Sequence, residues 1–136
     1  MKVLVDTHVF LWAYASRERL NPAVQSLLLN ESVEKYFSAA SAWEIIIKWG
    51  RGALELPDHP VSLVPLKVAE AGMHNLAITL HDVLKVSELP AIHKDPFDRL
   101  LIAQALRHGA KILTMDKVIA KYDVEVIALW LNEDDD

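Results

Sequence analysis

Cysteine is absent from the chain, and glycine and proline are scarce. The lack of cysteine excludes disulfide scaffolds, thiolate metal sites and cysteine nucleophiles. Four glycines and six prolines among 136 residues are far fewer than low-complexity chains contain, so the composition argues against disorder. The longest apolar run, Val9–Ala15, is much shorter than the roughly 20 residues of a membrane helix, and Asp6 interrupts any signal-peptide core. We therefore expect one cytoplasmic domain over residues 1–136 that does not enter a membrane.

Basic residues are also fewer than acidic residues. Fourteen lysine and arginine residues stand against 19 aspartate and glutamate residues, which gives a net charge of −5. Four of the acids form the run Glu133–Asp136, and we expect the acidic tail, residues 132–136, to be disordered. Proteins that bind nucleic acid through charge alone carry a general excess of lysine and arginine. Nucleic-acid chemistry would therefore depend on metal ions or on local basic residues, for which the candidates are Arg51, Lys94, Arg99 and Lys117.

What the chain does contain is an alternation of short apolar strands and helical segments. The pattern predicts strands at 2–5, 36–38, 76–79, 111–114 and 124–129, and helices near 8–15, 22–28, 41–49, 66–71 and 96–108. Another helix begins at the capping signal Thr79–Asp82, and residues 53–65, with three prolines, are expected to form a loop. Strands joined by helical crossovers form parallel sheets. We expect an α/β fold, a three-layer α/β/α sandwich with a central parallel sheet of four to five strands.

Acidic residues follow the predicted strands or open the predicted helices. These residues are Asp6, Glu44, Asp98 and Asp116. Sites in open parallel sheets form beyond the carboxyl ends of the strands, so we expect the four carboxylates to converge there. Clustered carboxylates repel one another unless a cation compensates their charge, and oxygen ligands suit Mg²⁺ or Mn²⁺. The pattern predicts a Mg²⁺ or Mn²⁺ site and hydrolysis of a phosphodiester by a metal-activated water.

Helix capping is the alternative role for these acids. Spacing alone is compatible with a capping box at Ser41 and Glu44, with Asp95 as the N-cap of the helix that contains Asp98, and with Asp116 as a further N-cap. Glu44 also has the spacing of an ion pair with Lys48. Asp6 fits this reading less well, because a carboxylate at the end of a buried strand is costly unless its charge is compensated.

Other catalytic patterns are missing from the sequence. The six histidines show no HxxxH or HxH pairing, which argues against a zinc site. No GxSxG, GxGxxG or Walker motif occurs, so an acyl-transfer triad and nucleotide binding of those kinds lack support. The predicted helix 41–49 carries Trp43 and Trp49 and is apolar nearly all round, which favours burial or a subunit interface.

Four segments resemble one known family in order along the chain. Leu4–His8, Ser38–Ile45, Asp95–Ala105 and Ile112–Asp116 resemble the PIN domain, and within it the VapC-like toxin ribonucleases of type II toxin–antitoxin modules. The resemblance spans residues 2–129. It implies a Mg²⁺- or Mn²⁺-dependent endoribonuclease on a parallel α/β sheet, often a homodimer, inhibited by an antitoxin protein bound near the active site.

The resemblance also assigns residues. Asp6, Glu44, Asp98 and Asp116 match the acidic metal-ligand positions, and Thr114 matches the serine or threonine that orients the last acid. Asp95 is an additional acid that we interpret as the helix N-cap.

Three other functions remain open. PIN domains also act in RNA processing outside toxin modules, and a catalytically inactive PIN-like module would only bind a partner. An inactive module is expected to have lost an acid, and none is missing here. A phosphoacceptor signalling domain would need an aspartate after the third strand and a lysine after the last, where this chain has Ile78–Leu80 and Leu129–Trp130.

Overall fold

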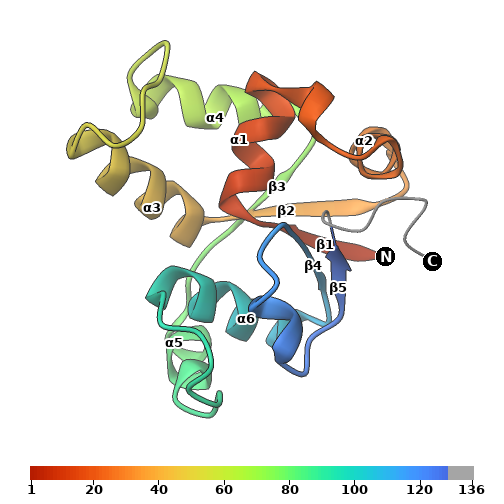
Figure 1. Ribbon diagram of the computed structural model, residues 1–136, viewed down its shortest axis with the longest axis vertical. Coiled ribbons are helices and arrows are strands. Elements are labelled where there is room, and N and C mark those ends of the chain that lie inside the picture. Colours follow the sequence, from red (N-terminus) through yellow and green to blue (C-terminus); the bar gives the residue numbers. More distant parts are fainter. Residues whose placement is uncertain (129–136) are drawn as a thin grey trace.

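A five-stranded parallel sheet forms the centre of the molecule (Figure 1). The structure, a computed structural model, describes residues 1–128. The strands are β1 (Lys2–Val5), β2 (Glu34–Ser38), β3 (His74–Leu76), β4 (Lys111–Thr114) and β5 (Val126–Ala128), in the order β3-β2-β1-β4-β5. This arrangement confirms the predicted α/β fold with a central parallel sheet. The expected disorder of residues 132–136 and the predicted strand residue Leu129 lie outside the described residues.

Helices cover both faces of the sheet, as predicted. Figure 1 places α1 (Thr7–Ala15), α2 (Pro22–Leu29) and α4 (Pro60–Glu70) on one side, and α5 (Leu80–Val86) and α6 (Pro96–His108) on the other, while α3 (Ala39–Gly50) continues from the end of β2. Two short 3-10 helices, η1 (Arg17–Arg19) and η2 (Ile119–Lys121), complete the elements of the described residues.

Alternating side chains of β1 connect the two layers of helices, because successive residues of a strand point to opposite faces. Val3 and Val5 belong to the core cluster that includes Phe10 of α1. Leu4 belongs to the second cluster, with Leu101 of α6. Burial on both faces explains why β1 is a continuous apolar run.

The order of the strands reverses at β1. The chain runs from β1 outward to β2 and β3 on one side, and returns to β4 on the other side of β1. Val5 of β1 pairs with Leu113 of β4, so the carboxyl ends of these two strands lie next to each other. Ligands of open α/β sheets bind at such a reversal.

The predicted start of α3 is wrong. We expected Ser41 to cap a helix over 41–49, but the helix begins at Ala39 and its N-cap is Ser38, whose Oγ accepts a hydrogen bond from the Ala40 N–H at 3.0 Å. Ser38 takes this role because it is the first hydroxyl-bearing residue that the chain meets as β2 ends. Ser41 Oγ instead accepts a hydrogen bond from Thr7 Oγ1 at 2.8 Å.

Two neighbouring predictions also need correction. Residues 53–65 do not remain a loop, because His59 Nδ1 accepts from the Val61 N–H at 3.1 Å and Pro60 begins α4 at the position where a missing N–H costs nothing. Strand β3 ends at Leu76, before the predicted end at Thr79, because Thr79 caps α5 through the predicted capping box with Asp82. None of the helices in residues 1–128 has the length and apolar character needed to cross a membrane.

Candidate metal centre

The reversal of strand order brings Asp6 and Thr114 together. Asp6 directly follows β1 and Thr114 is the last residue of β4; both are buried. Thr114 Oγ1 donates a hydrogen bond to Asp6 Oδ2 at 2.6 Å. The other oxygen, Asp6 Oδ1, accepts from the His8 N–H at 2.8 Å and so caps α1. Asp6 therefore caps a helix and also contacts the end of β4.

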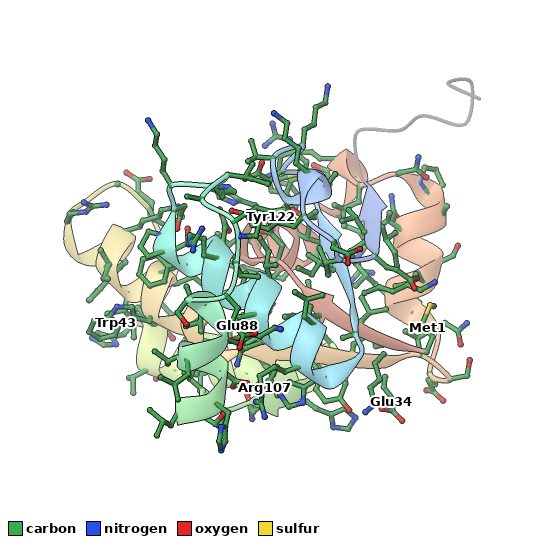
Figure 2. The ribbon with its side chains drawn as sticks, turned by 90° about the horizontal axis from the view of Figure 1, so that it is seen from below. Met1, Glu34, Trp43, Glu88, Arg107 and Tyr122 are labelled. Atoms are coloured by element: carbon green, nitrogen blue, oxygen red, sulfur yellow. The ribbon has the colours of Figure 1, made fainter. Side chains whose placement is uncertain are left out.

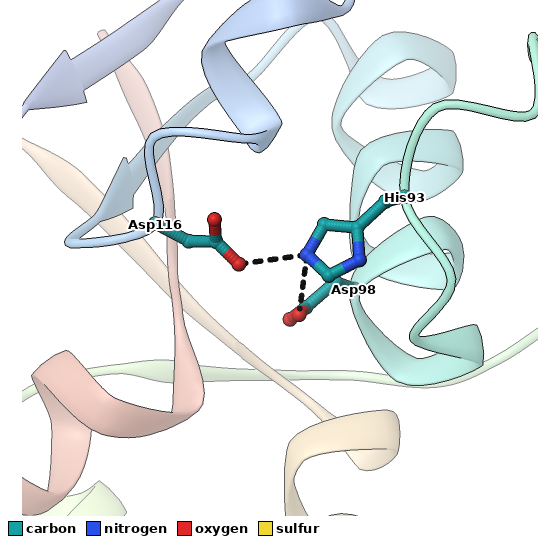
Figure 3. Close-up of side chains that lie close together, drawn as sticks. All are labelled: His93, Asp98 and Asp116. Carbon is teal, nitrogen blue, oxygen red and sulfur yellow. Dashed lines mark hydrogen bonds and ion pairs between the residues drawn. The ribbon is translucent and has the colours of Figure 1, made fainter.

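A second group of side chains contains His93, Asp98 and Asp116 (Figure 3). His93 Nε2 lies 2.7 Å from Asp116 Oδ2 and 3.1 Å from Asp98 Oδ2. One nitrogen or oxygen atom from each of the three residues lies within 4.8 Å of the others, a spacing that suits a common metal ion. Asp98 belongs to α6 and Asp116 to the turn after β4, and His93 stands between their carboxylates.

Two of the predicted acids, Asp6 and Glu44, act electrostatically on a third, Asp98. We call Asp6, Glu44, Asp98 and Asp116 the acidic cluster. Burial, together with the negative charges of Asp6, Asp95 and Glu44, raises the pKa of Asp98 from 3.8 to about 7. Asp98 thus keeps its proton up to about neutral pH in the metal-free protein, which is the behaviour expected where several carboxylates share a site without a cation.

Glu44 has a buried oxygen that finds no hydrogen-bond partner among residues 1–128. Its Oε2 accepts from Lys48 Nζ at 2.6 Å, which confirms the predicted ion pair. Within residues 1–128, Glu44 Oε1 is buried and accepts no hydrogen bond. Because α3 begins at Ala39, Glu44 lies in the second turn, and its predicted capping box with Ser41 is wrong. An unpaired buried carboxylate oxygen is costly, so a water or a cation is expected beside it.

Asp95 and Asp98 have different roles at the start of α6. Asp95 Oδ1 accepts from the N–H groups of Phe97 at 2.8 Å and Asp98 at 3.3 Å, so Asp95 is the predicted N-cap. A capping box would have the Asp98 carboxylate return a bond to the Asp95 N–H, but that N–H donates to His93 Nδ1 at 3.1 Å. The Asp98 carboxylate instead faces His93.

The alternative role of Asp116 as a helix N-cap is wrong, because the helix that follows, η2, has Val118 at its N-cap. Asp116 instead accepts a local bond within the turn. Its Oδ1 accepts from the Val118 N–H at 2.8 Å, while its Oδ2 faces His93. The Asp116 N–H donates to Thr114 Oγ1 at 3.0 Å. The hydroxyl of Thr114 therefore links Asp6 to the backbone of Asp116 and connects the two halves of the cluster.

His93 is the member of this site that sequence reasoning missed. Histidine–histidine spacing does not indicate His93, because it has no HxH or HxxxH partner. Its position two residues before the N-cap Asp95 is a local signal that can bring a ring nitrogen to the Asp95 N–H. The approach to Asp116, which lies beyond α6 and β4, has no signal in the local sequence.

A hollow of about 310 Å³ with basic walls lies beside the acidic cluster. Lys48, Arg51, Lys94 and Phe97 line it, together with Glu44 and Asp95 among others, and we call it the basic groove. The predicted basic residue Arg99 does not line it, because its guanidinium donates to the carbonyl oxygens of Pro90 and Val86. A larger hollow of about 410 Å³ lies elsewhere, lined by residues of α1, α2 and α4, and none of the acidic cluster lines it.

Comparisons with known proteins agree with this fold. The family model described as the PIN domain matches residues 3–125. DNA-bound VapBC from Salmonella typhimurium is similar in structure, with a TM-score of 0.70 at 14% identity over 95% of this chain and 98% of that chain. FitAcB from Neisseria gonorrhoeae has a TM-score of 0.65 at 19% identity over 94% of this chain and 98% of that one. A toxin–antitoxin complex from Klebsiella pneumoniae has a TM-score of 0.64 at 16% identity, with coverage of 94% and 98%. Among curated proteins, none matches this chain.

Proposed function

This chain belongs to the PIN domain family, a family of nucleases, and on that premise we propose that it is a metal-dependent endoribonuclease and the toxin of a toxin–antitoxin pair. The observation that carries the proposal is an excess of negative charge on the buried and partly buried carboxylates of the acidic cluster. Among residues 1–128, Glu44 Oε1 is buried without a partner, and burial together with neighbouring carboxylates raises the pKa of Asp98 to about 7. A divalent cation would compensate this charge.

The acidic cluster fits such a cation. Its four carboxylates are hard oxygen donors, which are the ligands of Mg²⁺ and Mn²⁺. When bound, the cation would lower the pKa of a coordinated water and stabilise charge on the phosphate. Thr114 would hold the Asp6 carboxylate in place through its hydroxyl. Lys48 pairs with Glu44 Oε2, which leaves Oε1 available as a ligand.

The basic groove supports a nucleic-acid substrate at this site. Lys48, Arg51 and Lys94 place positive charge beside the cluster in a chain that has an overall negative charge. Phe97 adds an aromatic ring to the same wall. Single-stranded nucleic acids bind to grooves that combine cations for the phosphates with aromatic rings for the bases. The choice of RNA over DNA rests on the resemblance to VapC-like ribonucleases.

Partner binding is the second part of the proposal. Trp43, on α3, has 59% of its surface exposed and lies at the outer edge of the molecule (Figure 2), and Ile46 and Trp49 on the same helix are also exposed. Exposed apolar side chains that gather on one element indicate a protein interface. We propose that this surface is covered by a second copy of the chain or by the cognate antitoxin.

Incubation of the purified protein with structured RNAs tests the enzymatic proposal. We expect cleavage with Mn²⁺ or Mg²⁺ and none when EDTA is in excess, because the chemistry depends on the cation. Full ribonuclease activity in excess EDTA would overturn the metal-dependent mechanism.

A further inference from the structure

His93 is held in place by two contacts of its own and one of its neighbour Ile92, none of which involves the acidic cluster. Its main-chain N–H donates to Tyr122 Oη at 2.6 Å, and the Ile92 N–H donates to the same oxygen at 3.2 Å. On the ring, Nδ1 accepts from the Asp95 N–H at 3.1 Å. The side chain is 14% exposed. A loop residue held this way presents its second ring nitrogen, Nε2, in a fixed direction.

The contact with Asp95 determines which ring nitrogen carries the proton. A backbone N–H can only donate, so Nδ1 must offer a lone pair, and we assign the hydrogen of the imidazole to Nε2. The Nε2–H group points at Asp116 Oδ2, 2.7 Å away, and Asp98 Oδ2, 3.1 Å away (Figure 3). His93 therefore presents a hydrogen-bond donor to the two carboxylates, whereas a metal ligand must present a lone pair.

We propose that His93 is a positioning residue that holds Asp98 and Asp116 ready to bind the cation and is not itself a ligand. The proposal rests on the proposed metal-dependent function. Asp98 stands at the start of α6 and Asp116 follows β4, and each presents its Oδ2 to His93 Nε2. One N–H group that bridges an oxygen of each fixes both side chains. Partners of this kind around metal ligands typically change metal affinity by roughly 10–100-fold.

Two substitutions separate this role from the alternatives. In His93→Asn the amide oxygen can replace Nδ1 as acceptor for the Asp95 N–H, but no donor reaches the carboxylates. In His93→Gln the amide N–H can replace Nε2–H, but the acceptor for Asp95 is lost. A positioning role predicts that His93→Asn loses most of the metal affinity and that His93→Gln retains most of it. A role limited to anchoring the loop predicts the opposite order.

The measurement is a titration of metal-free protein with Mn²⁺, in which free Mn²⁺ is quantified by its electron paramagnetic resonance signal. We expect the Kd for Mn²⁺ to rise roughly 10–100-fold in His93→Asn and only a few-fold in His93→Gln. Melting curves in EDTA serve as the control for folding. An unchanged Kd in His93→Asn, or a larger loss in His93→Gln than in His93→Asn, would overturn the proposal.

The parent protein supplies a test that requires no substitution. Pulsed electron paramagnetic resonance of the Mn²⁺-loaded protein detects nitrogen bound directly to the metal. We expect no coupling from a directly coordinated imidazole, and a strong coupling would make His93 a ligand and contradict the proposal. If the parent protein binds no Mn²⁺ at millimolar concentration, the proposed metal-dependent function fails, and the inference about His93 fails with it. If the parent binds Mn²⁺ but the variants do not differ, only the inference fails.

Discussion

At the residue scale, Asp6 and Asp116 each divide their two carboxylate oxygens between a local backbone N–H, which for Asp6 is the helix cap, and another side chain of the site. Asp6 Oδ1 caps α1 and its Oδ2 accepts from Thr114. Asp116 Oδ1 accepts from Val118 and its Oδ2 faces His93. Capping and a role in the cluster are therefore compatible in one residue. An asparagine at either position can keep the oxygen that accepts from the local backbone N–H while it removes the charge.

Asp98 gives the protein a pH-dependent stability that asparagine should remove. An unfolded aspartate loses its proton near its ordinary pKa of 3.8, whereas folded, metal-free Asp98 keeps it to about pH 7. Between these limits the folded state binds more protons, so this group lowers the free energy of unfolding as the pH rises. Asp98→Asn should lack this decline and be more stable than the parent above about pH 7 in EDTA. Urea denaturation of both proteins from about pH 5 to about pH 8 measures how the free energy of unfolding depends on pH. Parallel pH profiles for the two proteins would contradict the raised pKa of Asp98.

Residues with local roles were predictable, and residues with distant partners were not. Asp95 caps α6 through N–H groups two and three positions away, which its sequence context already indicated. The capping box at Glu44 was wrong because Ser38 offers a hydroxyl closer to the end of β2. His93 was missed because its contact with Asp116 joins residues 23 positions apart.

At the scale of elements, the hydroxyl of Thr114 joins the end of β1 to the turn that follows β4. It donates to Asp6 Oδ2 and accepts from the Asp116 N–H. Valine has nearly the same shape but has no hydroxyl, so Thr114→Val leaves a buried carboxylate oxygen and an N–H without this partner. We expect a loss of roughly 1–3 kcal/mol in the free energy of unfolding, measured in urea, and a reduced affinity for Mn²⁺.

Thr114→Ser is the matched control for that change. Serine keeps the hydroxyl and removes only a methyl group, so it should retain most of the Mn²⁺ affinity. Equal Mn²⁺ affinity in Thr114→Val and the parent protein would show that the hydroxyl does not position Asp6.

The basic groove between α3 and the start of α6 should govern the salt dependence of RNA binding. Each phosphate contact contributes a slope of about −0.7 to the dependence of log affinity on log salt for single strands. Arg51→Ala and Lys94→Ala should each weaken binding and reduce the slope by about that amount. Fluorescence anisotropy in EDTA measures binding without cleavage. Lys2→Ala, which removes a charge at the amino end of β1, is the control. It should change neither the affinity for RNA nor the slope of its salt dependence.

The elements themselves were predicted unevenly. Strands β1 and β4 are short apolar runs buried on both faces, and the sequence located both with their correct ends. Helix α4 was underestimated because three prolines suggested a loop, although Pro60 begins the helix and Pro65 lies within it. Strand β3 carries few apolar residues, and its position follows from its pairing with β2.

At the scale of the whole molecule, the apolar surface of α3 predicts an assembly. Trp43, Ile46 and Trp49 are exposed in the single chain, and covering them removes apolar surface from water. We expect light scattering at tens of micromolar to show a dimer, or the product of the neighbouring open reading frame to raise the melting temperature. A monomer with no gain in stability from that product would contradict the prediction.

The most direct test of the central claim measures RNA cleavage and metal-free melting on one set of variants. The set contains Asp6→Asn, Glu44→Gln, Asp98→Asn and Asp116→Asn, with Asp95→Asn as the internal control because asparagine caps a helix about as well as aspartate. Each amide keeps the size of the side chain but lacks the charge that holds a cation. We predict that cleavage by each of the four cluster variants falls by orders of magnitude. In EDTA these variants should melt at or above the melting temperature of the parent protein. Asp95→Asn should retain most of the parent activity. Cleavage at the parent rate by all four would mean that these acids do not hold a catalytic cation and that the nuclease site lies elsewhere.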